Sequence, residues 1–425
     1  MTNYHEIAMN IQTLFAQALG IQTPWTVEGV EFDPEEKKLH INIGIERGSK
    51  FYYKDPETGV EGEYKLHDTE KKTWRHLNFF DHECYLHAKT PRIKTPEGKV
   101  RLVSPPWSGQ KLGFTLLFEA LIMFLCQSMP VNKIGELLNI NDKRIWAVLE
   151  HYVQEARKAE DFSEVTAVGM DETSEKKGHN YISLFVDLNK KRTIFVADGK
   201  DNKTVIAFKE DLEEHGGKAE NITDVSCDMS KAFIKGVSEQ LPNAQITFDK
   251  FHIIKVINEG VDAVRREEVK HNPLLKKKRY IFLKNDENLT QKQKAFKEEL
   301  KLSGLNIKTL RALNIREAFQ QIYSAKTIEE FTLGLKKWYG WALRSQLPPM
   351  QKVAKTIKEH WDGIIRWKHS QLSNGILEGL NSVVQAAKRR GRGYKTKHLK
   401  TMVYLMTGKL NFHTLNQNIK STHLG

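Results

Sequence analysis

Cysteine is scarce in this chain of 425 residues: only Cys84, Cys126 and Cys227 occur, and they are far apart. Because no two of them are separated by two residues, the sequence excludes a disulfide framework and a zinc ribbon with cysteine ligands. Widely spaced thiols fit a reducing compartment. We therefore expect a cytoplasmic protein without disulfides.

Long apolar runs are also missing. The most apolar run, residues 114–126, contains Glu119 and is too short to span a bilayer. The first ten residues, MTNYHEIAMN, lack the basic start and apolar stretch of a secretory signal. We expect no membrane partner and no secretion signal.

The chain does contain enough apolar residues to form packed cores. Hydrophobic residues make up 40% and aromatic residues 9% of the sequence, which excludes a disordered chain. At roughly 100–200 residues per domain, the length predicts about two to four domains.

The charge is distributed unevenly. Residues 1–250 contain 32 basic and 39 acidic side chains, a balance of −7, whereas residues 251–425 contain 34 and 14, a balance of +20. One explanation is a solubilising surface. The concentration of positive charge in one half instead favours a polyanionic partner, most simply DNA.

The first 160 residues divide into two predicted parts. Residues 1–105 alternate apolar and polar side chains over short stretches, which predicts a small β-rich module ending near Ser104-Pro105-Pro106. Residues 106–160 have helical periodicity. This pattern predicts a helical domain after the β-rich module.

Two short helices in residues 106–160 suggest a DNA-binding motif. Apolar positions from Val131 to Leu138 predict one helix, and Asp142 is the expected N-cap of a second, residues 143–151. A helix-turn-helix would present Lys143 and Arg144 to DNA. An ordinary helical hairpin explains the pattern equally well, and both interpretations stay open.

Residues 161–254 predict an α/β sheet with the order β-β-β-α-β-α-β. Asp171, Asp228 and Asp249 stand at the C-terminal ends of the first, fourth and fifth predicted strands, and the first strand is expected to end at Asp171-Glu172. Ligand sites in such sheets lie outside the carboxyl ends of the strands. The sequence therefore predicts a carboxylate site at one edge of this sheet.

Residues 255–365 predict only helices, and residues 366–425 contain one further helix over 373–390 followed by a basic tail. Trp338 and Trp341 are one helical turn apart within the helical stretch. They could pack in a core or stack on DNA bases, and core packing is the simpler interpretation.

Carboxylates at adjacent strand ends suggest a metal site. Ionised Asp171 and Asp228 would repel each other unless a cation lies between them. Oxygen ligands suit Mg²⁺ or Mn²⁺, and two such ions about 3.5–4 Å apart promote phosphodiester cleavage. The alternative is that both aspartates only cap strands and turns.

The helix over residues 373–390 adds a third carboxylate and a basic cluster. Glu378 shares one helix face with Asn381, Gln385 and Arg389. Basic side chains after it would clamp DNA phosphates beside a metal ligand. The alternative is a solvated helix surface. The predicted phosphate contacts are Lys388, Arg389, Arg390, Arg392 and Lys395.

Four segments together resemble a DDE transposase. They are VGMDE with Asp171, VSCDMS with Asp228, FDKFHIIK, and SNGILEGLNSVVQAAKRRGRGY with Glu378. The nearest resemblance is to the ISL3 group of bacterial insertion-sequence transposases, and it extends from about residue 70 to about residue 410. Their order and spacing make the resemblance specific, although each segment alone would be weak.

The resemblance implies an RNase H-like catalytic core interrupted by an all-helical insertion. It also implies that Asp171, Asp228 and Glu378 bind two Mg²⁺ or Mn²⁺ ions, with Asp249 and His252 near the active site. Similar proteins often carry paired cysteines in an N-terminal zinc module. This chain lacks them, so we expect no zinc.

The implied function is a DNA transposase that binds the terminal inverted repeats of its element, then cleaves and transfers strands. A homodimer acting on double-stranded DNA in the bacterial cytoplasm, associated with the nucleoid, is expected. A structure-specific RNase H-like nuclease or resolvase is one alternative. A domesticated DNA-binding regulator without catalysis is another.

Overall fold

The computed structural model describes residues 10–110, 113–174, 181–303, 305–370, 375–391 and 393–412. The chain forms two compact units. The first consists of residues 1–159, 389–406 and 410–425, and the second of residues 160–388 and 407–409.

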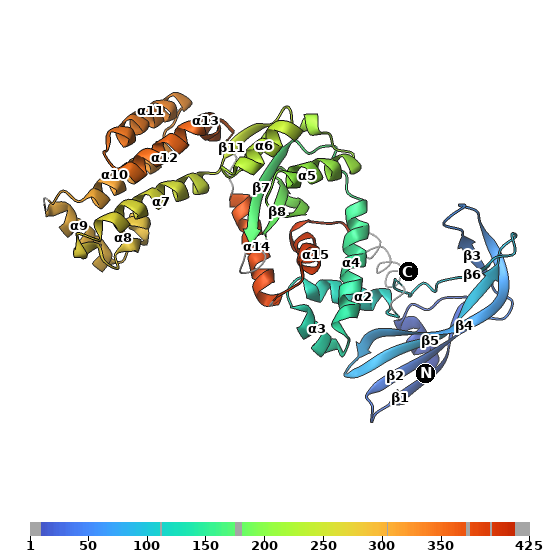
Figure 1. The fold of residues 1–425 in the computed structure, drawn as a ribbon. Coiled ribbons are helices and arrows are strands. Elements are labelled where there is room, and N and C mark those ends of the chain that lie inside the picture. The colour runs from blue at the N-terminus through green and yellow to red at the C-terminus, as the bar shows by residue number, and fades with distance from the viewer. Residues whose placement is uncertain are drawn as a thin grey trace, which may run out of the picture. The chain divides into compact units, whose positions relative to one another are not determined.

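A β-rich module forms the first part of the first unit (Figure 1). Its six-stranded sheet has the order β1-β2-β5-β4-β3, with β6 paired to β5. Leu39, Ile41 and Ile43 alternate into the core, as a half-buried strand requires. The predicted β-rich N-terminal region is therefore confirmed. The elements are α1 (Ile11–Ala18), β1 (Trp25–Asp33), β2 (Lys38–Ile45), β3 (Lys50–Lys54), β4 (Glu61–Phe79), β5 (His82–Lys94) and β6 (Val100–Leu102).

Helices form the rest of the first unit. Buried side chains of the helices, including Phe118, Ile134 and Leu149, make one apolar core to which Met402 also belongs. The elements are α2 (Leu116–Cys126), α3 (Val131–Leu138), α4 (Asp142–Lys158) and most of α15 (Thr396–Thr407).

The turn between α3 and α4 differs slightly from the prediction. Asn139 ends α3 in the left-handed conformation (φ 54°), and the side chain of Asn141, rather than Asp142, caps α4. Asp142 is the first residue of α4, where its negative charge interacts favourably with the positive end of the helix dipole. Helix α4 continues past residue 151 to Lys158 because Val148, Leu149, Tyr152 and Val153 extend its buried face.

One carboxyl group is buried in this helical core. Glu119 of α2 is fully buried and accepts hydrogen bonds from the Tyr152 hydroxyl (2.6 Å) and the Gln110 backbone N–H (3.0 Å). Burial raises the pKa of Glu119 above its ordinary value of 4.5, although both hydrogen bonds oppose that shift. The folded unit therefore favours the protonated form of this side chain.

We expect Glu119→Gln to be at least as stable as the wild type at pH 7. Because the pKa of Glu119 is higher in the folded than in the unfolded protein, folding takes up a proton between these two pKa values. The free energy of unfolding therefore falls as the pH rises from 4.5 through the pKa of the folded protein. Gln keeps an acceptor oxygen and has no charge to bury. Thermal melts from pH 4 to pH 8 should show a smaller loss of stability in the variant. A Tm lowered at neutral pH would contradict this account.

The second unit contains a five-stranded sheet with the order β11-β10-β7-β8-β9 (Figure 1). Strands β7, β10 and β11 are parallel, whereas β8 and β9 run antiparallel to their neighbours. The predicted order β-β-β-α-β-α-β is confirmed. The elements are β7 (Ala167–Ser174), β8 (Tyr181–Asp187), β9 (Arg192–Asp198), α5 (Lys203–Glu214), β10 (Asp224–Cys227), α6 (Lys231–Gln240) and β11 (Gln245–Phe248), with a 3-10 turn at Ala219–Asn221.

Strand β7 is longer than predicted. Its expected end was Asp171-Glu172, but it continues to Ser174 because β8 pairs with it that far, so Asp171 lies inside the strand. On its other side, β7 pairs with β10 only over residues 167–169. Asp171 is therefore within the strand and also just beyond the last pair with β10.

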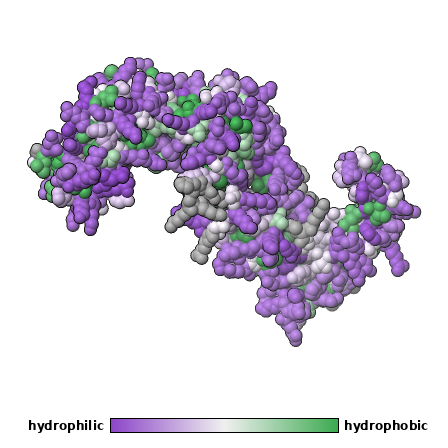
Figure 2. Space-filling view, viewed as in Figure 1, coloured by the Kyte–Doolittle hydropathy of each residue, from purple (hydrophilic) through white to green (hydrophobic). Residues whose placement is uncertain are grey.

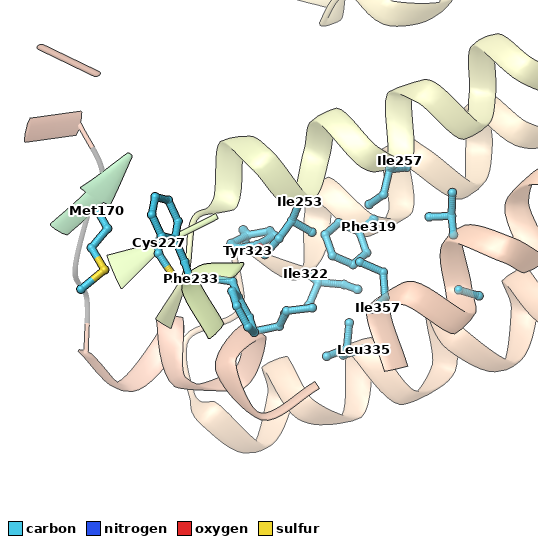
Figure 3. Packing of buried hydrophobic residues seen from close by; sticks show 14 of the residues in the cluster. Met170, Cys227, Phe233, Ile253, Ile257, Phe319, Ile322, Tyr323, Leu335 and Ile357 are labelled. Atoms are coloured by element: carbon cyan, nitrogen blue, oxygen red, sulfur yellow. The ribbon is translucent and has the colours of Figure 1, made fainter. Parts of the chain in front are cut away.

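Residues 250–370 are helical, and the described part of this range contains no strand. Their core is continuous with the sheet: Figure 3 shows Met170, Cys227 and Phe233 together with Ile253 and Phe319 of the helical part. The helices are α7 (Lys250–Glu268), α8 (Arg279–Leu283), α9 (Gln291–Leu302), α10 (Lys308–Ile322), α11 (Ile328–Arg344), α12 (Pro348–Glu359) and α13 (Trp361–Ser370), with 3-10 turns at Pro273–Leu275 and Asp286–Asn288.

The two tryptophans of α11 have different environments. Trp338 is buried and donates its indole N–H to the Ile315 carbonyl oxygen (2.7 Å), so it belongs to the core as predicted. Trp341 is 43% exposed, so core packing does not describe it.

Polar side chains cover most of the face drawn in Figure 2, and apolar side chains appear there in separate spots. No helix among the described residues is long and apolar enough to cross a membrane.

Candidate active site

Asp171 is half-buried in the central strand of the sheet. One carboxylate oxygen accepts the Glu172 backbone N–H (2.8 Å), and the other accepts the side-chain amide of Asn381. Burial raises the pKa of Asp171; the positive charge of His252 opposes this, and the Asp228 and Asp249 carboxylates add to it. Asp171 therefore lies within the electrostatic reach of both other aspartates.

Strand register places these aspartates at one level of the sheet. Ser226 of β10 pairs with Gly169 of β7, so Asp228, two residues further along, is level with Asp171. Cys227 pairs with Phe248, which makes Asp228 level with Asp249 in the same way. Neighbouring strands are about 4.8 Å apart. The parallel strands thus bring three carboxylates to one edge, as the sequence predicted.

Backbone hydrogen bonds fix two of these carboxylates. Asp228 accepts the Ser230 N–H (2.9 Å). Asp249 caps α7 by accepting the Phe251 N–H (3.0 Å) and is itself buried. Both side chains are therefore held at the turn between a strand and the following helix.

His252 lies beside the carboxylates, and its protonated form is favoured there. Its Nδ1 is 2.8 Å from a carboxylate oxygen of Asp249. This hydrogen bond raises the pKa of His252 against the effect of burial, and the charges of Asp249, Asp171 and Asp228 raise it further. The predicted pair of Asp249 and His252 does lie next to Asp171 and Asp228.

Helix α14 (Gly375–Gly391) packs along β7 through four successive contacts. The Leu377 side chain is so close to Gly169 that a Cβ there would be only 2.9 Å from it. Further along α14, two side-chain amides and one lysine ammonium group donate hydrogen bonds to β7. These hydrogen bonds join Asn381 to Asp171, Gln385 to Thr173 (2.6 Å), and Lys388 to the Ser174 carbonyl.

The spacing of these contacts shows that α14 and β7 run side by side. From Leu377 to Lys388 a helix rises about 16.5 Å, and from Gly169 to Ser174 a strand also advances about 16.5 Å. Helix and strand therefore stay in register over the whole contact. Glu378 lies directly after Leu377, which contacts Gly169, and about one turn before Asn381, which bonds Asp171. The backbone of Glu378 is therefore near the level of Asp171, within about one helical turn.

Glu378 is exposed at the start of α14. No group of three or more His, Cys, Asp or Glu side chains in the described part of the chain is close enough to hold a metal ion as it stands. The structure thus gathers Asp171, Asp228, Asp249 and His252, and brings the helix of Glu378 alongside them.

The predicted DNA contacts do not form one cluster beside Glu378. Lys388 bonds β7 in the second unit, whereas Arg389, Arg390 and Lys395 belong to the first unit and line one pocket there. Arg392 lies outside the described residues.

The two basic residues predicted at the start of α4 also differ from each other. Lys143 is exposed. Arg144 is half-buried with its guanidinium 3.8 Å from the centre of the Phe114 ring, and burial lowers its pKa. Lys143 is thus available at the surface, while Arg144 packs within the helical core.

Comparison with known proteins identifies the family. A family model described as a transposase of the ISL3 type matches residues 168–403, which is more than half of the chain. The chain belongs to the ISL3 family of transposases. A second model, the helix-turn-helix domain of transposase family ISL3, matches residues 103–153. This match favours the helix-turn-helix over an ordinary helical hairpin for α3 and α4.

Curated relatives of this ISL3-family chain are similar over nearly their whole length. The transposase for insertion sequence element IS1557 of Mycobacterium tuberculosis is 24% identical, covering 93% of this chain and 95% of the relative. The transposase for insertion sequence element IS1001 of Bordetella parapertussis is 24% identical, covering 89% and 94%. The resemblance inferred from four short segments is thus confirmed.

Proposed function

We propose that this ISL3-family transposase binds the terminal inverted repeats of its insertion sequence and cleaves and transfers DNA strands there. The supporting observation is the shared level of Asp171, Asp228 and Asp249 on three parallel strands, with the Glu378 helix docked along β7. Asp171, Asp228 and Glu378 are the proposed catalytic carboxylates.

The proposed catalytic core is RNase H-like. Its support is a central strand β7 with antiparallel neighbours on one side and parallel neighbours on the other. The proposed division is a β-rich module (1–105), a DNA-binding domain (106–160), the core in two parts (161–254 and 366–425) and a helical insertion (255–365).

The residues at this edge suit a hard divalent cation. Three aspartates and the Asp171-bound side chain of Asn381 offer oxygen ligands, which Mg²⁺ and Mn²⁺ prefer. The side-chain oxygen of Asn381 is buried and has no hydrogen-bond partner among the described residues. A buried acceptor left without a donor is costly, and a cation or its water would satisfy it.

Asp171, Asp228 and Glu378 would hold the ions. When bound, a pair of Mg²⁺ or Mn²⁺ ions activates the attacking oxygen and stabilises the leaving oxygen. The chain itself orients Asp171 through Asn381 and raises the pKa of His252 through Asp249. No covalent protein–DNA intermediate is needed, so no Tyr or Ser nucleophile is proposed.

The helix-turn-helix would read the element ends, and the basic second half of the sequence would add phosphate contacts. A homodimer is proposed because two element ends must be cut together. Its place of action would be the cytoplasm, on nucleoid DNA.

A strand-transfer assay tests this function. Purified protein is incubated with Mg²⁺ or Mn²⁺ and a duplex carrying the inverted repeats that flank the reading frame, beside a duplex with shuffled ends. We expect cutting and joining only of the true ends, and only with metal. Cutting governed by DNA structure would instead indicate a nuclease or resolvase, and tight binding without cutting a regulator.

A further inference from the structure

A basic pocket of about 740 Å³ lies within the first unit, outside the carboxylate site. The starts of α3 and α4 form one wall, and side chains from residues 389–391 and 393–398 form the other. Pockets of this size commonly hold a ligand such as a nucleotide. The pocket therefore lies between the helix-turn-helix and a segment more than 200 residues later in the sequence.

Positive charge dominates the lining. Lys133, Arg389, Arg390 and Lys395 line the pocket, against the single carboxylate of Asp142. Lys133 is paired with Glu136 (2.6 Å), but neither Arg389 nor Lys395 has an acidic partner within ion-pair distance among the described residues. Arg390 donates to the Ser128 carbonyl oxygen (2.9 Å), which holds this wall against the helix-turn-helix.

The start of α3 also favours an anion. Pro130 occupies its N-cap and provides no side-chain hydrogen bond. The Lys133 N–H already donates to the Pro130 carbonyl oxygen (3.0 Å), so among the described residues only the Asn132 N–H of the first turn has no partner. The Val131 N–H donates to the Tyr394 hydroxyl (3.5 Å), which links this helix start to the opposite wall. Helix N-termini attract phosphate groups through unpaired N–H groups and the helix dipole.

Aromatic rings connect the two walls of the pocket. The rings of Trp146 and His398 are parallel, with centres 3.9 Å apart, and Tyr394 meets Trp146 edge-on at 5.0 Å. Since Trp146 and Tyr394 lie on opposite walls, their contact holds the wall with Lys133 against the wall with Arg389 and Lys395. A preformed spacing of charges suits a regular anion such as the DNA backbone.

We propose that this pocket binds backbone phosphates of the duplex that the helix-turn-helix reads, with Arg389 and Lys395 as the principal contacts. The proposal rests on the proposed function only in taking DNA as the ligand. Because these contacts reach phosphates and not bases, they should strengthen binding to any sequence equally.

The test compares a double variant of the pocket with a variant of a nearby lysine, in full-length protein without metal. Arg389→Ala/Lys395→Ala should weaken binding by roughly 10- to 30-fold and reduce the slope of log Kd against log salt by about 1.8, equally for end and shuffled duplexes. Lys397→Ala is the matched control, since Lys397 pairs with Glu150 (2.6 Å) and does not line the pocket. Its slope should equal that of the wild type.

An unchanged slope in the double variant, with a normal Tm, would overturn the proposal. It would also be overturned if inorganic pyrophosphate quenched Trp146 fluorescence, judged against Trp146→Phe, while the slope stayed unchanged; the pocket would then serve a free anion. Because no metal is present, this result is independent of cleavage. If the wild-type protein transferred no strands with metal while the double variant changed the slope, the proposed function would be contradicted and the pocket would still stand.

Discussion

Asp228→Asn is expected to lower strand cleavage and joining by a factor of roughly 10³ or more while leaving DNA binding unchanged. Asp228 is level with Asp171 on one side and Asp249 on the other, so it is the central carboxylate of the edge. Asn has nearly the same shape and can still accept the Ser230 N–H. Only the charge that a cation requires is removed.

The variant should not be less stable than the wild type in the absence of metal. Asp228 raises the pKa of Asp171, which shows that the two charges repel each other. Removing one charge relieves this repulsion, so inactivity cannot be attributed to unfolding if the Tm is unchanged or higher. The matched control is Asp224→Asn at the other end of β10, where the carboxylate pairs with Arg366 (2.6 Å). That variant should cleave normally.

Asn381→Ala is expected to reduce cleavage by roughly 100-fold, as loss of a group that orients a metal-binding carboxylate does. The Asn381 amide holds one oxygen of Asp171, and its own oxygen is buried without a partner among the described residues. Without it, Asp171 can rotate and the start of α14 loses one of its contacts with β7. The metal concentration for half-maximal cleavage should therefore rise by at least tenfold.

Ser382→Ala provides the control, because Ser382 is the next residue of α14 and is exposed. It should keep wild-type cleavage and metal dependence. If Asn381→Ala lowered cleavage with an unchanged metal requirement, Asn381 would serve only to pack the helix. Wild-type cleavage in Asn381→Ala would remove it from the site altogether.

Much of the second unit could be predicted because its signals are local. Apolar runs ending at Asp171, Asp228 and Asp249 revealed the strands, and the parallel arrangement of β7, β10 and β11 then brought the three carboxylates to one edge. The exact end of β7 could not be predicted, since it depends on pairing with β8 as far as Ser174.

The contacts of α14 with β7 could not be predicted from the sequence. Asn381 and Gln385 were placed on the face of Glu378 by helical periodicity, but nothing in the sequence gave them partners. Their partners, Asp171 and Thr173, are more than 200 residues away, and the helix register on β7 depends on Leu377 packing against Gly169. Such a register is a property of the tertiary fold.

The basic cluster after Glu378 was predicted as one phosphate clamp, and it is divided. Lys388 turns toward β7, while Arg389 and Lys395 face the helix-turn-helix. Consecutive residues of a helix point about 100° apart, so neighbours in sequence can contact different parts of a protein. The run of positive charge alone does not reveal this division.

The proposed metal site depends on Glu378 as a ligand, and Mn²⁺ binding to Glu378→Gln measures that dependence. Titration of wild-type protein, Glu378→Gln and the exposed control Glu359→Gln should show Mn²⁺ affinity reduced at least tenfold in Glu378→Gln alone, as loss of one carboxylate ligand implies. Cleavage of the element ends should disappear in the same variant. Wild-type Mn²⁺ affinity and cleavage in Glu378→Gln would contradict the proposed metal site.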